Sequence, residues 1–143
     1  MKSRTLKRLE SVCNHYGINA IYVFGSRSKE VADFVKGKGN MDKDCNSDVD
    51  LGVLPDRDSL LTPQDKIKAT IALEDLFKVN RVDLIILPEA PTFLCLDIIE
   101  GELLYTSDPD ETARFELYVL RRAGDLAFYE RQRRIQVLTG EIP

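Results

Sequence analysis

The fold is most constrained where an apolar run, Ile21 to Phe24, passes directly into Gly25 and Ser26. Successive residues that favour β-structure are typical of a buried strand. A Gly-Ser turn directly after such a strand leaves backbone amides free to meet an anion. We therefore expect a strand that ends at a phosphate-binding turn formed by Gly25 and Ser26.

Two acidic residues lie in a second strand-like run, Ser47 to Val53. Because side chains alternate along a strand, Asp48 and Asp50 are expected to project from one face. Carboxylates are the ligands that Mg²⁺ prefers, so the pair predicts a site for a divalent metal. Either acid alone would be interpreted as an ordinary turn residue.

A third acid, Asp83, stands near the start of the apolar run Arg81 to Leu87, which has the pattern of an inner strand. A helix expected between this strand and the preceding one makes their connection a crossover. Such a connection implies parallel neighbours and right-handed winding. Asp48, Asp50 and Asp83 are therefore expected to gather along one cleft.

The order of these features resembles the nucleotidyltransferase fold of the DNA polymerase β superfamily. The resemblance implies that Gly25 and Ser26 hold the triphosphate of ATP. It also implies that Asp48, Asp50 and Asp83 hold two Mg²⁺ ions, or Mn²⁺ in their place, which drive attack on the α-phosphorus. Metal ions that neutralise developing charge are the chief requirement of nucleotidyl transfer, which needs little covalent chemistry from the protein.

The fold class implied by the resemblance is α/β, with a mixed sheet flanked by helices and a long C-terminal helix. The small size and that last helix also resemble the minimal nucleotidyltransferases of toxin–antitoxin operons. That family implies a HEPN-domain ribonuclease toxin as partner, neutralised by transfer of AMP to a tyrosine. Two alternatives are small-molecule adenylylation of the aminoglycoside type and a non-catalytic antitoxin that binds nucleotide and blocks its partner sterically.

The chain of 143 residues is long enough for one domain with a core that needs no disulfide or metal. We expect a single nucleotidyltransferase domain over 1–143, with a catalytic core over 1–88 and a helical extension over 89–143. A net charge of −4 argues against sequence-independent binding of long nucleic acid, which depends on an excess of Lys and Arg. The basic stretch 129–134 is accordingly interpreted as a solvated helix end, with RNA binding as the alternative.

The segment between Ser26 and Asp48 is longer than in compact members of the superfamily. A short helix over 27–35 is expected first, followed by an inserted loop over about 36–46. Glycines, asparagines and mixed charges in that loop suit a solvated segment with little apolar surface to bury. We expect a surface insertion that is dispensable for folding, with a lid that contacts substrate as the alternative.

Helical patterns are expected on both sides of these strands. Leu6 to Tyr16 has the spacing of an amphipathic helix that closes at Gly17. A second helix, capped by Thr62, is expected to reach Lys78, with Asn80 as the left-handed stop. Its apolar stripe is expected to consist of Ile67, Ile71 and Phe77, broadened by Leu73 and Leu76.

The C-terminal part is expected to form a short helix over 92–100, a strand over 103–105 and a long helix that starts at Pro109. In that last helix one apolar stripe is expected to face the core or an interface. Its members are Phe115, Val119, Ala123 and Leu126.

The cysteines Cys13, Cys45 and Cys95 are far apart and form no C-x-x-C pair. Reduced thiols in a cytoplasmic protein are the preferred interpretation, and a zinc site with His15 is the alternative. His15 is expected to be structural. The charged N-terminus lacks the apolar segment of a signal peptide, and no uncharged run has the length of a membrane helix.

Overall fold

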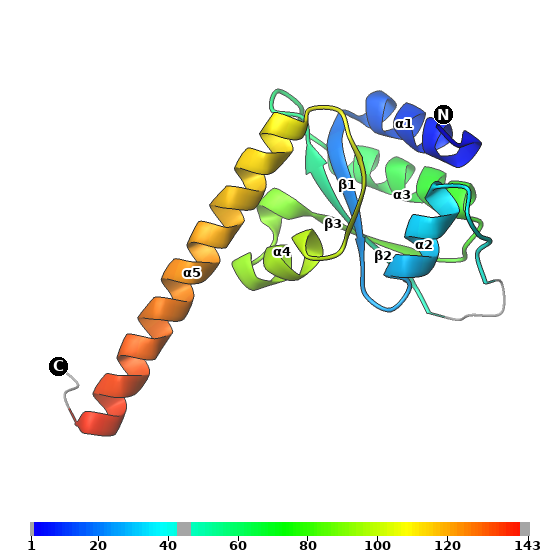
Figure 1. Ribbon diagram of the computed structural model, residues 1–143. Coiled ribbons are helices and arrows are strands. Elements are labelled where there is room, and N and C mark those ends of the chain that lie inside the picture. The colour runs from blue at the N-terminus through cyan, green and yellow to red at the C-terminus, as the bar shows by residue number, and fades with distance from the viewer. Residues whose placement is uncertain (1, 43–46, 141–143) are drawn as a thin grey trace.

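The computed structural model describes residues 2–42 and 47–140. Five α-helices, one short 3₁₀ helix and four strands alternate along this part of the chain (Figure 1). Their order is α1 Arg4–Tyr16, β1 Ile18–Phe24, α2 Ser28–Val35, β2 Val49–Pro55, α3 Pro63–Phe77, β3 Val82–Ile86, η1 Leu87–Glu89, α4 Thr92–Ile99, β4 Glu102–Thr106 and α5 Pro109–Thr139.

The four strands form one mixed sheet in the order β3-β2-β1-β4. Strand β1 runs antiparallel to both β2 and β4, whereas β2 and β3 are parallel. Helix α3 connects β2 to β3, so the predicted crossover and the predicted mixed sheet are both confirmed. The end of β1 and the starts of β2 and β3 consequently meet at the same edge of the sheet.

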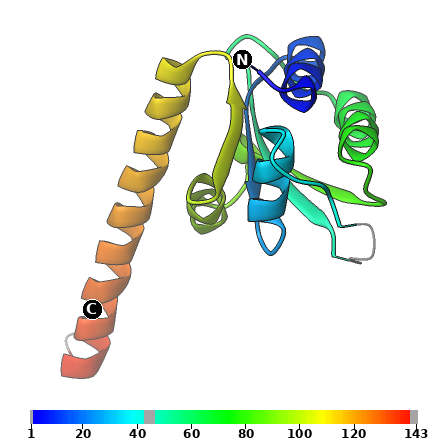
Figure 2. The ribbon, with the colours of Figure 1, turned by 45° about the vertical axis from the view of Figure 1, so that its right-hand side comes forward.

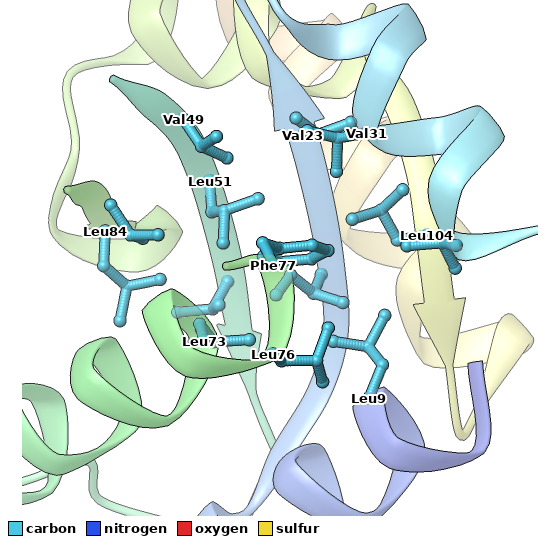
Figure 3. Close-up of a cluster of buried hydrophobic side chains, with 14 of the residues drawn as sticks. Leu9, Val23, Val31, Val49, Leu51, Leu73, Leu76, Phe77, Leu84 and Leu104 are labelled. Carbon is cyan, nitrogen blue, oxygen red and sulfur yellow. The ribbon is translucent and has the colours of Figure 1, made fainter. Parts of the chain in front are cut away.

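Helices cover both faces of the sheet, with α1, α2 and α3 on one side and α4 and α5 on the other (Figure 2). The larger core lies under α1, α2 and α3, and Val23, Leu51 and Leu84 enter it from three neighbouring strands (Figure 3). Residues at alternate positions of β2 and β3 therefore face α4, and Asp50 and Asp83 are among them.

Helix α3 buries only part of the apolar stripe that was expected. Ile67 and Ile71 are 61% and 58% exposed, whereas Leu73 and Phe77 are fully buried. The buried positions form one stripe at helical spacing, Ala69, Leu73, Leu76 and Phe77. The prediction of Ile67 and Ile71 as core was wrong because α3 carries apolar side chains on more than one face. Only one of these faces packs against the sheet.

The ends of α1 and α3 are determined by local hydrogen bonds. Gly17 has φ 67° and ends α1, as expected. Helix α3 begins at a capping box between Thr62 and Asp65 and reaches its C-cap at Lys78, as expected. The left-handed residue that stops it is Lys78 itself, with φ 57°, and not Asn80. The amide of Lys78 donates to the carbonyl of Glu74, which closes the last turn before Asn80 is reached.

The segment expected as a solvated insertion is partly anchored to the core. Met41 is only 8% exposed and belongs to the core cluster under α1, α2 and α3. The expectation of little apolar burial is therefore wrong at this residue, because tertiary packing buries a side chain that its polar neighbours would leave in solvent. Residues 43–46, including Cys45, lie outside the described part of the chain.

Helix α5 is attached to the sheet only along its N-terminal half. Asn19, which is buried in β1, accepts hydrogen bonds from Ser107 and Asp108 and donates to Thr112. Val119 and Ala123 of the predicted stripe are buried, but Leu126 is 37% exposed. The 31-residue helix is about 46 Å long, and its C-terminal half extends beyond the rest of the described chain (Figures 1 and 2).

The two described cysteines, Cys13 and Cys95, are both buried and free. Burial, with Asp56 and Glu10 nearby, raises the pKa of the Cys13 thiol to about 12. His15 is exposed on α1, and its ring packs edge-on against the ring of Tyr16. Within residues 2–42 and 47–140, no helix combines the length and hydropathy that crossing a membrane requires.

Helix α4 packs unusually close to β2 because Gly52 has no side chain. A Cβ atom added at Gly52 would lie 2.5 Å from Cγ2 of Ile98, which is fully buried. We predict that Gly52→Ala displaces α4 and lowers the free energy of unfolding by about 1–3 kcal/mol. Urea unfolding followed by circular dichroism measures the change.

Gly124→Ala is the matched control, since an added Cβ there meets nothing within 4 Å. Gly124 lies inside α5, where alanine should stabilise the helix by about 0.5–1 kcal/mol. An equal effect of both substitutions would contradict the close packing of α4 on β2.

Candidate active site at the edge of the sheet

The strand register places the predicted site residues beside one another. Phe24, the last residue of β1, pairs with Asp50 of β2. Gly25, the next residue, therefore also lies close to Asp50. Asp50 in turn pairs with Asp83 of β3. Asp48 lies just before β2, at the same sheet edge. The structure therefore brings together the turn and the acids that the sequence predicted.

Gly25 is required where it stands, both by its backbone conformation and by its neighbour. Its φ is 82°, a left-handed value that side chains disfavour. A Cβ atom added at Gly25 would lie only 2.7 Å from Oδ2 of Asp50. The absence of a side chain thus lets the turn approach the carboxylate closely, and an anion on the turn would be adjacent to any cation held by Asp50.

Ser26 is exposed at the same turn, directly before α2. The turn is tightened by a hydrogen bond of 3.3 Å from the amide of Ser28 to the carbonyl of Gly25. Helix α2 begins at Ser28, and the first turn of a helix presents amides and the positive end of its dipole. The surroundings of Ser26 can accordingly receive a phosphate group.

Like charges crowd around Asp50. Burial raises the pKa of the Asp50 carboxyl, and the nearby carboxylates of Asp83 and Asp48 raise it further. This shift means that the charged form of Asp50 is disfavoured in the protein alone. A bound divalent cation would reverse that balance, because it favours the ionised carboxylates.

Asp48 forms an ion pair with Arg81, a residue that was not included in the predicted site. Nε of Arg81 lies 3.5 Å from Oδ2 of Asp48, and both side chains are substantially exposed. Exposed ion pairs of this kind are weak, worth about 0–1 kcal/mol. The contact can therefore yield readily to a metal ion that competes for Asp48.

The donor set fits Mg²⁺ chemically, since three carboxylates supply the oxygen ligands that this ion prefers. In their present positions, however, no three acidic, His or Cys side chains of the described residues meet the geometry of a metal centre. Asp50 and Asp83 are already adjacent in register.

Sequence reasoning missed Arg27, the residue after Ser26. Its side chain is only 4% exposed and contacts Glu30 and the backbone on both sides of the segment 43–46. The signal that could have identified it is an Arg and a Glu three residues apart, which is an ordinary helical ion pair.

Among the described residues, three cavities lie away from the acids, one of them of about 260 Å³ beside Phe34 and Met41. Another of about 300 Å³ is bounded by α4 and α5, and one of about 330 Å³ by the turn after β2 and the segment 86–89. Asp48, Asp50 and Asp83 line none of these three cavities. Gly25, Ser26 and Asp83 are exposed at the sheet edge, and Asp48 and Asp50 are half-buried.

Several solved structures share the fold over nearly the whole chain. A chain in a toxin–antitoxin structure with AMP-PNP is 23% identical, with a TM-score of 0.64, and the match covers 94% of this chain and 98% of that one. A chain in the complex of a tri-AMPylated Shewanella oneidensis HEPN toxin with an MNT antitoxin is 20% identical, with a TM-score of 0.63 and coverage of 97% and 99%. No curated protein matches this chain.

The family model described as polymerase beta, nucleotidyltransferase, matches residues 7–110. This range spans the whole sheet and includes the Gly-Ser turn and all three acids. The match extends over more than half of the chain. The chain belongs to the polymerase β nucleotidyltransferase family.

Proposed function

We propose that this protein is a metal-dependent nucleotidyltransferase that transfers AMP from ATP to a protein, a HEPN-domain ribonuclease toxin. The observation that carries the proposal is the approach of Gly25 to the carboxylate of Asp50, which is in register with Asp83. This arrangement puts a phosphate-binding turn directly against a set of carboxylates.

In this proposal the Gly25–Ser26 turn holds the triphosphate, and Asp48, Asp50 and Asp83 hold the metal. Bound Mg²⁺ would neutralise charge on the phosphates and keep the attacking and leaving oxygens in line. A tyrosine hydroxyl of the acceptor forms the new bond to the α-phosphorus as the bond to pyrophosphate breaks. The protein contributes position and electrostatics, because no covalent intermediate is needed.

Two observations favour a protein acceptor over a small molecule. Gly25, Ser26 and Asp83 are exposed, so an acceptor can approach them from solvent. An aminoglycoside-type acceptor would call for a more enclosed pocket. The fold is also shared with chains from structures of HEPN–MNT and MntA–HepT complexes, one containing an AMPylated toxin.

Nucleotide binding by this protein should depend on a divalent metal. ATP should bind only weakly without Mg²⁺, because its triphosphate and the acids around Asp50 repel each other. Calorimetric titration of ATP with Mg²⁺ and with EDTA compares the two conditions. Equal affinity in both would exclude the metal assignment.

Ser26→Ala should weaken binding of Mg²⁺–ATP by about 1–3 kcal/mol, since it removes a hydroxyl donor at the phosphate turn. The fold should be unaffected because Ser26 is exposed and packs in no core cluster. Ser11→Ala, at an exposed position of α1, is the control. A fall in melting temperature with unchanged affinity would make Ser26 a structural turn residue instead.

Asp50→Asn should reduce AMP transfer by several orders of magnitude, because Asp50 is central among the acids and its loss disturbs charge neutralisation and alignment together. The assay incubates the protein with ATP, Mg²⁺ and the HEPN partner, followed by intact mass of the partner. Asp58→Asn, at an exposed turn beyond β2, is the matched control.

Mass gain in AMP units with wild type and Asp58→Asn, but not with Asp50→Asn, is the expected result. If both wild type and Asp50→Asn neutralise the partner without any mass change, transfer is refuted. That result would favour an antitoxin that acts by steric blocking.

A further inference from the structure

Arg27 is a buried cation located between the two halves of the candidate site. It follows Ser26 directly in sequence, yet its side chain is only 4% exposed. Burial of a guanidinium group is unfavourable unless its charge and its N–H donors are satisfied. The groups that satisfy Arg27 therefore indicate what its burial achieves.

Four hydrogen bonds to other described residues hold the guanidinium group in position. Nε and Nη2 donate to the two carboxylate oxygens of Glu30 at 3.0 and 2.9 Å, in a bidentate pair. Nη1 donates to the carbonyl of Ser47, and Nη2 to the carbonyl of Asp42, both at 3.0 Å. Glu30 also accepts the amide of Asp42. One ion pair thus holds the backbone on both sides of the segment 43–46.

The contact at Ser47 matters because sheet pairing does not yet hold the chain there. Pairing of β2 with β3 begins at Val49, and pairing with β1 reaches only to Asp50. Asp48 lies between the tethered carbonyl of Ser47 and the first residue of the ladder. Its backbone is therefore fixed from one side by the sheet and from the other by Arg27.

We propose that the Arg27–Glu30 pair is a positioning device that fixes Asp48 relative to the Gly25–Ser26 turn. The inference rests on the proposed function, in which Asp48 is a metal ligand. Because Arg27 directly follows Ser26, the same residue is joined to the phosphate turn covalently and to the acid-bearing segment by a hydrogen bond. Displacement of Asp48 would then weaken metal binding without altering any of the three acids.

The planar fork of arginine is essential to this role. Lysine would keep the charge at position 27, but an ammonium group cannot make the bidentate contact with Glu30 and also reach two backbone carbonyls in fixed directions. Arg27→Lys is therefore the conservative test of geometry. Groups that orient metal ligands typically change metal affinity about 10–100-fold when they are replaced.

A single substitution could destabilise the fold by leaving a buried charge unpaired, so the deciding variant removes both partners. Arg27→Met with Glu30→Met replaces the pair by apolar side chains of similar volume, a change that is often neutral for stability. The matched control is Glu111→Met with Arg114→Met. That pair has the same three-residue spacing and a similar distance, 3.0 Å, but lies on α5 away from the acids.

The experiment measures free Mn²⁺ by electron paramagnetic resonance in the presence of a non-hydrolysable ATP analogue, alongside thermal melting of each variant. Arg27→Lys and the Arg27–Glu30 double variant should bind Mn²⁺ about 10–100-fold more weakly than wild type. The control double variant should bind it as wild type does. Melting of the deciding variant should remain cooperative.

Wild-type Mn²⁺ affinity in a cooperatively folded Arg27–Glu30 double variant would overturn the positioning role and leave the metal assignment intact. Failure of the wild-type protein itself to bind Mn²⁺ would instead overturn the metal assignment and this inference with it. The two outcomes separate failure of the inference from failure of the proposed function.

Discussion

The parallel register of β2 and β3 places Asp50 beside Asp83, and this contact between like charges is the constraint on which the site depends. The sheet can tolerate it because the same two strands bury Leu51 and Leu84 on the opposite face. Since side chains alternate along a strand, the residues that form the core also determine where the acids point. A register slip of one residue would bury the acids and expose the core, so one packing arrangement specifies both stability and the site.

Helix α4 lies on the same face of the sheet as the acids, of which Asp83 is exposed and Asp48 and Asp50 are half-buried. Gly52, two residues after Asp50, lets Ile98 of α4 approach β2 closely. Gly25, Ser26 and Asp83 remain exposed where β1 ends and β2 and β3 begin. Exposed residues at the end of the sheet are suited to a protein acceptor, because the surface of another protein can contact them directly.

The sequence predicted the parts of the molecule that depend on local patterns. Asp48, Asp50 and Asp83 could be placed because period-two alternation and the crossover rule need only short-range information. The exposure of Ile67 and the burial of Met41 could not be predicted, because each depends on which surfaces meet in three dimensions. Arg27 was missed for the same reason, since its partner at Ser47 is distant in sequence and carries the bond on a backbone carbonyl.

The electrostatics of Asp50 bear on the choice between an enzyme and a purely steric antitoxin. Burial and two neighbouring carboxylates raise the pKa of Asp50, which means that at neutral pH its ionised form opposes folding. A steric binding module would be more stable with a neutral residue at this position, because nothing in blocking a partner requires the charge. A protein that transfers AMP through metal ions does require it, since the cation offsets the repulsion when it binds. The unfavourable charge therefore supports the proposed cation at this site, which a steric antitoxin that binds no nucleotide would not need.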